Sequence, residues 1–367
     1  MISKKIKVGI VGAGTTGVYL SSLLHKRGYQ VDLFEKAFSP RTHGCGILIV
    51  QDGINALSEG NLELAQKIIK RGTPVTHFEF RNLKNKVANI NSVSYKEGDF
   101  LSVLIHRKII LETLLEYLPS NCLHTNAEFT SLEQKNNKVI VSFRDRSKWE
   151  GDILIGVDGI FSKVRQFVTP GKYLSYLGDL VWRGVVEDHD FCPEGNFLVY
   201  MRSRGIYANF FSVGKGKTHW GFFIEKQQTD LEKRRSRPDN ILIPEIELAK
   251  LPDAPRKVIQ RSSPEEMVCN FSYDLNQLPH IYNKRVLLMG DAAHAKSPTR
   301  ARGMTAGFED ALTLAHHFEN YSDIDEMLYH FQEERLPIVH EYQRSSREIS
   351  QKIGRSRKHI QDHQQAA

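Results

Sequence analysis

Three glycines near the start of the chain, Gly12, Gly14 and Gly17, have the spacing of a phosphate-binding turn. They stand in the segment GAGTTG, which follows the apolar residues 8–11 and opens a stretch of helix-forming residues. The first glycine permits a tight turn, the second lets a pyrophosphate approach the backbone, and the third lets helix and strand pack closely. Glu35 ends the next apolar run, where a carboxylate can bind a ribose diol. The pattern predicts a dinucleotide site in which the helix N-terminus binds the phosphates.

A second candidate group is Asp291, a carboxylate that follows the apolar residues 286–289 and Gly290. A charge at the end of a buried strand is costly unless a partner takes up its hydrogen bonds. FAD is longer than a nicotinamide dinucleotide, and its ribitol chain needs polar partners far from the first glycines. We therefore expect Asp291 to bind a ribitol hydroxyl, and the N–H groups after Gly303 to lie at the flavin edge that becomes negative on reduction. The alternative is that Asp291 caps a local turn.

The hydrophobic pattern predicts the elements that position these groups. Residues 5–35 read as strand, glycine-rich turn, helix and strand, a βαβ unit that predicts a parallel sheet. Residues 172–270 contain short alternating runs separated by turn signals, which predicts antiparallel hairpins. The α/β pattern then returns, and residues 324–351 read as helix despite Pro337. We therefore expect one domain made from both outer parts of the chain, an inserted β domain, and a cleft between them.

The composition limits the class of protein. The chain has 367 residues, of which 40% are hydrophobic and 25% charged, enough for two domains with their own cores. No stretch reaches the roughly 18 apolar residues of a membrane span, and the basic start runs into a strand rather than a signal peptide, which indicates a cytoplasmic protein. The four cysteines are too far apart for a disulfide framework or a zinc site. The net charge of +7 fits a solvated surface or attraction to a phosphate-bearing cofactor better than nucleic-acid binding.

A third apolar run ends in an acid and a glycine, at Asp158 and Gly159, and completes a set of three motifs. In order and separation these motifs resemble those of the class A FAD-dependent monooxygenases, the para-hydroxybenzoate hydroxylase-like group. The segments EKAFSPRTHGCGI, IHRKIILETLL, VWRGVV and FQEERLPIVHEYQRSS extend the resemblance over about residues 5–350.

The resemblance implies an α/β fold, with a Rossmann-like FAD-binding domain of the GR2 type, an inserted, mainly antiparallel β substrate domain and a C-terminal helical segment. We expect the FAD-binding domain to comprise residues 1–72, 101–171 and 281–320. The substrate domain should comprise residues 73–100 and 172–280, and the helical segment residues 321–367.

The resemblance also implies contacts with the cofactor. Arg41 and Arg107 would lie near the FAD, and Asp158 is associated in this family with both FAD and pyridine-nucleotide handling. The alternative for Arg107 is a cation on a surface helix. The full set of candidate cofactor-binding residues is Gly12, Gly14, Thr16, Gly17, Glu35, Lys36, Arg41, Gly46, Arg107, Asp158, Asp291, Pro298, Gly303 and Met304.

Enzymes of this family reduce FAD with NADPH or NADH and let it react with O2, forming a flavin C4a-hydroperoxide that transfers one oxygen atom. The resemblance therefore implies hydroxylation or epoxidation of an aromatic or polycyclic small molecule. Two alternatives stay open: a flavin reductase or dehydrogenase, and a protein that holds FAD without redox function. A flavin halogenase is disfavoured because the Trp-x-Trp-x-Ile-Pro signature is absent. The substrate, the choice of nicotinamide and the oligomeric state do not follow from the sequence.

The inserted β region is rich in aromatic residues, and alternation along its strands should place about half of them on the cleft face. Such a pocket suits a flat or apolar substrate. Each aromatic can instead belong to the core, and each arginine can be a solvated surface cation. No metal site is expected, and His294 reads as part of the flavin-site scaffold. The candidate substrate contacts are Arg183, Arg202, Tyr207 and Phe222.

The loop after Asp291 departs from the family pattern. Ala301, Arg302 and Gly303 stand where the family has Gly-Gln-Gly, and Thr305 replaces an asparagine. Alanine tolerates a positive φ poorly, so the first change bears on the backbone of the loop. Arg302 either faces the flavin edge, where a cation would favour the reduced state, or points outward into solvent.

Overall fold

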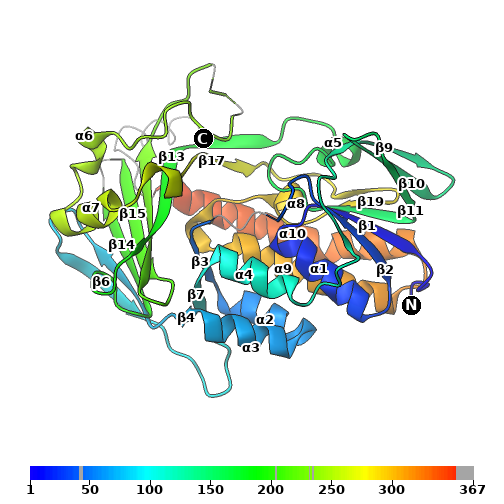
Figure 1. The fold of residues 1–367 in the computed structure, drawn as a ribbon, viewed down its shortest axis with the longest axis horizontal. Coiled ribbons are helices and arrows are strands. Elements are labelled where there is room, and N and C mark those ends of the chain that lie inside the picture. The colour runs from blue at the N-terminus through cyan, green and yellow to red at the C-terminus, as the bar shows by residue number, and fades with distance from the viewer. Residues whose placement is uncertain (41–43, 203–204, 231, 234, 353–367) are drawn as a thin grey trace.

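The computed structural model describes residues 1–40, 44–202, 205–230, 232–233 and 235–352, and its framework is two large β-sheets (Figure 1). The first sheet has six strands in the order β18-β19-β12-β1-β2-β8. β1 pairs in parallel with β2 and β12, and β12 pairs in parallel with β19, so the carboxyl ends of these strands meet at one edge. The strands are β1 (Lys7–Val11), β2 (Gln30–Phe34), β8 (Leu123–His124), β12 (Ile153–Gly156), β18 (Tyr282–Asn283) and β19 (Val286–Leu288).

Helices pack against one face of this sheet (Figure 1). The helix after the glycine turn buries every residue from Val18 to Leu24, and Tyr19 contacts Phe308 edge to face at 5.4 Å. The last helix runs through Pro337 without a break, as the sequence predicts. The helices are α1 (Thr15–Lys26), α2 (Gln51–Gly60), α3 (Leu62–Arg71), α4 (Arg107–Leu115), α9 (Arg302–Asn320) and α10 (Ile324–Ser350).

Two small sheets and several short helices complete this part of the molecule. β9 (Phe129–Lys135), β10 (Lys138–Phe143) and β11 (Lys148–Gly151) form an antiparallel sheet, from which Trp149 donates a hydrogen bond to Asp32. β3 (Gly46–Ile49), β7 (Val103–His106) and β4 (Thr73–Pro74) form the other. The short helices are α5 (Arg165–Val168), α8 (Asp291–His294) and the 3₁₀ turn η2 (Pro298–Arg300).

The second large sheet has seven strands in the order β17-β13-β16-β15-β14-β5-β6. All of its neighbours pair antiparallel except β14 and β5, which are parallel. The hairpins at β14, β15 and β16 match the alternating runs of the sequence. The strands are β5 (His77–Arg81), β6 (Val87–Ser92), β13 (Leu174–Glu187), β14 (Asn196–Arg202), β15 (Ile206–Ser212), β16 (Lys217–Glu225) and β17 (Val268–Leu275); α6 (Glu245–Leu248), α7 (Asp253–Gln260) and the 3₁₀ turn η1 (Pro264–Glu266) lie beside them.

Each large sheet has its own hydrophobic core, and a third, smaller cluster lies where β3 and β7 approach β15. The core of the second sheet contains Trp182, Tyr200, Phe210 and Trp220 and extends to Leu248 and Val258 of the short helices. This arrangement confirms the α/β fold class with an inserted, mainly antiparallel sheet. Within the described ranges, no helix is both long enough and apolar enough to cross a membrane.

Candidate active site

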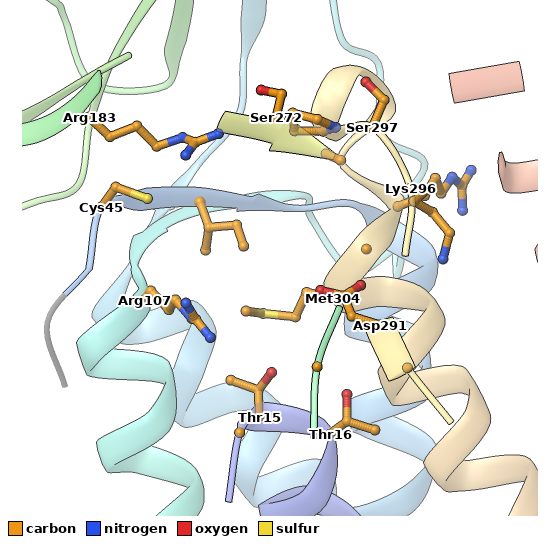
Figure 2. Close-up of a pocket in the computed structure, with 18 of the residues that line it drawn as sticks. Thr15, Thr16, Cys45, Arg107, Arg183, Ser272, Asp291, Lys296, Ser297 and Met304 are labelled. Carbon is orange, nitrogen blue, oxygen red and sulfur yellow. The ribbon is translucent and has the colours of Figure 1, made fainter. Parts of the chain in front are cut away.

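A cavity of about 1230 Å³ lies between the two large sheets. It extends from the glycine turn after β1, past the start of α8 and α9, to the face of the seven-stranded sheet. Figure 2 shows Arg107 and Met304 pointing toward one another across it, with Thr15 and Thr16 at one end and Arg183 at the other. One continuous space therefore joins the dinucleotide motif to the aromatic sheet.

The three glycines differ in the space around them. Gly12 has a φ of +115°, and a Cβ there would lie 2.5 Å from the carbonyl oxygen of Val157. A Cβ on Gly14 would meet no atom within 4 Å, so its backbone is open to the cavity. A Cβ on Gly17 would lie 2.0 Å from the Gly12 oxygen, so Gly17 provides close packing and does not line the cavity. The turn leaves room for a phosphate group beside Gly14.

Two carboxylates are held at this end of the cavity. Glu35 accepts hydrogen bonds from the N–H groups of Ala13 and Ala37, both at 3.0 Å, which fixes its position after β2. Asp158 Oδ2 accepts one from Lys163 N at 2.7 Å, while its buried Oδ1 has no partner among the described residues. A buried carboxylate oxygen without a donor is costly, so this site fits a ligand that supplies a hydroxyl or amide. Lys36 and Arg107 line the same cavity.

Asp291 is the first residue of α8, and its exposed side chain faces the cavity. No side-chain cap hydrogen bond is made at the start of this helix, so the alternative of a local cap is not what the structure shows. A Cβ on Gly303 would lie 4.0 Å from Asp291 Oδ1, and Gly303 and Met304 form the first turn of α9. The carboxylate and the N-terminus of α9 therefore face the same part of the cavity, beside Pro298.

The backbone of the loop before α9 is left-handed at Ala301. Ala301 has φ 53° and ψ 25°, the left-handed region that favours glycine. Arg302 lines the cavity and is partly exposed. Its guanidinium forms an ion pair with Asp52 and lies 5.0 Å from the centre of the Tyr342 ring. The buried hydroxyl of Thr305 has no hydrogen-bond partner in the described part of the chain.

A chain of buried polar groups lies behind α8. Lys296 Nζ is 2.9 Å from His294 Nδ1, and His294 Nε2 is 2.6 Å from Asp310 Oδ2. Asp310 Oδ1 accepts a hydrogen bond from Arg335 Nε at 2.9 Å. Burial, and next the charge of Lys296, lower the pKa of His294, so it is neutral at neutral pH. Burial alone would raise the pKa of Asp310, but His294 and Arg335 hold it below its usual range, so Asp310 is ionised. His294 is thus part of a buried hydrogen-bonded network behind α8.

The cavity face of the seven-stranded sheet carries both polar and aromatic groups. Arg183, Tyr207 and Asn209 line the cavity together with Phe223, and the Arg183 guanidinium lies 5.5 Å from the centre of the Phe223 ring. His219 accepts a hydrogen bond from Gly46 N at 3.1 Å, and burial lowers its pKa to about 3, so it is a neutral acceptor.

One of the substrate contacts expected from the sequence is wrong. Phe222 is fully buried in the core on the other face of the sheet, where it packs against Trp182. Alternation along β16 places Phe223 toward the cavity instead. The aromatic residues of this sheet divide between its two faces. Tyr207, Phe211 and Phe223 line the cavity, whereas the core on the other face contains Trp182, Tyr200, Phe210, Trp220 and Phe222.

The remaining expectations divide into those the structure places and those it does not describe. Arg107 is exposed, but into the cavity rather than to outer solvent. Arg41 and the side chain of Arg202 lie outside the described residues. Four residues that line the cavity were not among those predicted from the sequence: Lys296, Asn209, Phe223 and His219. The one available signal was the alternation along β16, which places His219 and Phe223 on the same face of the strand. Across the described ranges, no three His, Cys, Asp or Glu side chains gather into a group that could hold a metal ion.

The chain is similar in sequence and in fold to known flavoproteins. The family model described as FAD binding domain matches residues 5–346. Salicylate hydroxylase from Pseudomonas putida is 27% identical over 356 residues, which cover 84% of this chain and 76% of that protein. Chloroplastic zeaxanthin epoxidase from Spinacia oleracea is 24% identical over 85% of this chain and 47% of that enzyme, so the chain spans about half its length. HpxO from Klebsiella pneumoniae, solved with FAD and uric acid, shares the fold with a TM-score of 0.84 and 21% identity, covering 94% of this chain and 88% of that chain.

Proposed function

This chain belongs to the family defined by that FAD binding domain and is a class A FAD-dependent monooxygenase. On this premise we propose that it transfers one oxygen atom of O2 to an aromatic or polycyclic small molecule, with NADPH or NADH as reductant. The observation that carries the proposal is the single cavity in which the glycine turn, the Asp291–Gly303 wall and an aromatic sheet face come together. A site that bound only a dinucleotide would not need the aromatic sheet face.

The residues around the cavity fit FAD in an extended form. The backbone at Gly14 would bind the pyrophosphate, and Glu35, held by two amides, would bind the adenosine ribose. Asp291 would accept hydrogen bonds from the ribitol, and the N-terminus of α9 at Gly303 and Met304 would lie at the pyrimidine edge. The other proposed contacts are Thr16, Lys36, Gly46, Arg107, Asp158 and Pro298.

When bound, FAD supplies the redox chemistry, since it accepts a hydride from the nicotinamide and reacts with O2. The chain positions the substrate and keeps water away. The face formed by Tyr207, Phe211 and Phe223 would hold a flat ring, and Arg183 would pair with an anionic or electron-rich polar group on it. The left-handed conformation of Ala301 supports an ordinary flavin loop despite the missing glycine.

The division into domains is part of the same proposal. Residues 1–72, 101–171 and 281–320 would form the FAD-binding domain, and residues 73–100 and 172–280 the substrate domain. The separate cores of the two large sheets support it.

The test is oxygen transfer by purified protein in the presence of NADPH, ¹⁸O2 and a panel of phenolic and polycyclic compounds. We expect bound, acid-releasable FAD and a product that carries ¹⁸O. NADPH oxidation that yields only hydrogen peroxide with every compound would favour a reductase, and bound FAD without any NADPH oxidation a non-redox scaffold. Gly14→Val is the matched control, because its side chain would enter the open space beside the turn and exclude the cofactor while the fold persists.

A further inference from the structure

Lys296 is a buried lysine on the cavity wall, in the segment that connects Asp291 with the loop before Gly303. It is only 8% exposed, and Figure 2 shows it on the same side of the cavity as Asp291 and Ser297. A buried ammonium group needs acceptors for its three N–H bonds. Within the described residues Nζ has one hydrogen-bond partner, Nδ1 of His294 at 2.9 Å. Further N–H groups are therefore available to whatever occupies the cavity.

The partner of Lys296 is itself held in one state. His294 Nε2 lies 2.6 Å from the ionised carboxylate of Asp310, so the ring proton stays on Nε2 and Nδ1 is the acceptor. Asp310 is fixed in turn by hydrogen bonds from Arg335 Nε at 2.9 Å and Gly290 N at 3.0 Å. His294 can accept a hydrogen bond from Lys296 whether the lysine is an ammonium or a neutral amine. The contact holds the side chain without fixing its charge.

The surroundings of Lys296 bring its pKa well below that of an exposed lysine. Burial lowers the pKa of Lys296 to about 8, against the attraction of Asp291 and then Asp310. Glu309 and Asp310 of α9 are each paired with Arg335. The charged and titratable groups that surround Lys296 are Asp291 and His294 on α8, Arg302, Glu309 and Asp310 on α9, and Arg335 and Tyr342 on α10, the Tyr342 ring centre being 6.0 Å from Nζ.

We propose that Lys296 is an acid–base residue that takes up a proton when the FAD in this cavity is reduced, and so compensates the negative charge that the flavin gains. The proposal rests on the proposed function, because it requires FAD beside Asp291. In the reaction, the nicotinamide gives a hydride, with its two electrons, to FAD. Above about pH 8, where Lys296 is largely a neutral amine, this amine takes one proton from solvent and becomes an ammonium, and no other bond changes. A nearby negative charge favours the protonated lysine, so reduction raises its proton affinity.

The test is the midpoint potential of the holoenzyme, measured anaerobically against pH between about pH 6 and about pH 10, a range that brackets the pKa of Lys296. The slope gives the number of protons taken up per two electrons. Lys296→Arg is the matched variant, since arginine keeps the positive charge but does not titrate in this range. Above about pH 8, wild type should take up more protons per two electrons than Lys296→Arg, and below that pH the two should agree.

Lys296→Met removes both charge and proton. At every pH it should take up as many protons per two electrons as Lys296→Arg does, and its FAD midpoint potential should be lower than that of Lys296→Arg. Equal proton numbers in wild type and Lys296→Arg throughout the range, with FAD bound in both, would overturn the proposal. If the methionine variant does not fold, the comparison of wild type with arginine still decides. A protein that oxygenates substrate but shows equal proton numbers refutes only this inference, whereas a protein that binds no FAD refutes the proposed function as well.

Discussion

Replacing Asp310 with asparagine should destabilise the protein strongly, because this buried carboxylate carries the charge opposite Arg335 and also accepts hydrogen bonds from two other buried groups. Asp310 is 1% exposed, and it accepts hydrogen bonds from His294, Arg335 and Gly290 N. Removing one partner of a buried ion pair costs about 3–5 kcal/mol. Arg335 keeps a second acid, since Glu309 Oε2 lies 2.9 Å from its guanidinium. We therefore expect the free energy of unfolding to fall by about 3 kcal/mol, the lower end of that range. This is a large share of the roughly 5–15 kcal/mol that stabilises a typical domain.

The effect of Asp310 on stability should depend on pH with a definite sign. Its neighbours hold the folded pKa of Asp310 below the ordinary value of 3.8. The unfolded chain therefore binds the proton first as the pH falls, and the stabilisation is complete above about pH 4 and is lost in acid as the pH approaches the folded pKa. The difference between wild type and Asp310→Asn should be constant near neutral pH and shrink below about pH 4.

The assay is urea unfolding of the FAD-free protein, followed by tryptophan fluorescence. Asp325→Asn is the matched control, because Asp325 is 64% exposed and its pair with Arg285 should contribute less than about 1 kcal/mol. In the double variant Asp310→Asn/Arg335→Met the unpaired cation is gone, so the loss should be smaller than the sum of the two single losses. The reasoning fails if Asp310→Asn loses no more stability than Asp325→Asn, or if the single losses simply add.

Three further outcomes are expected. Asp291→Ala should weaken FAD binding about tenfold to a hundredfold, the equivalent of about 1.5–3 kcal/mol for a charge-assisted hydrogen bond, as measured by the fluorescence of released FAD; unchanged retention would mean that the ribitol lies elsewhere. Ala301→Gly should raise the free energy of unfolding by up to about 1 kcal/mol, because glycine adopts the φ of 53° without strain, and a loss of stability would contradict this. Arg302→Gln should lower the FAD midpoint potential and Asp52→Asn should raise it, because the ion pair partly cancels the cation at the flavin loop; equal potentials in all three proteins would show that this pair does not act on the flavin.

The sequence predicts the parts of the site that depend on local backbone geometry. Gly12, Gly14 and Gly17 are recognisable because a turn between strand and helix imposes its own spacing. The ends of β2 and β19 place Glu35 and Asp291 at one sheet edge only once the strands are taken as parallel. The conformation of Ala301 was not predicted, because an alanine in place of glycine suggests a changed backbone, yet Ala301 adopts the left-handed region.

The contacts that depend on the phase of a strand or on distant helices could not be predicted. Alternation shows that Phe222 and Phe223 face opposite ways, but it does not say which face meets the cavity, because that depends on how the sheet packs against its own short helices. Lys296 gives no sequence signal either. Its burial and its contact with His294 follow from Asp310 and Arg335, which come from two other helices.

The order of strands in the two large sheets has a consequence for biosynthesis. β14 pairs with β5 across residues as distant as His77 and Asn196, and the edge of β12 stays open until β19 is made. A ribosome releases the glycine turn early, but it delivers Asp291 and Gly303 only after both sheets have most of their strands. Open strand edges on a growing chain invite wrong pairing at this stage. The residues that would bind the two ends of FAD are therefore all present only when the chain is nearly complete.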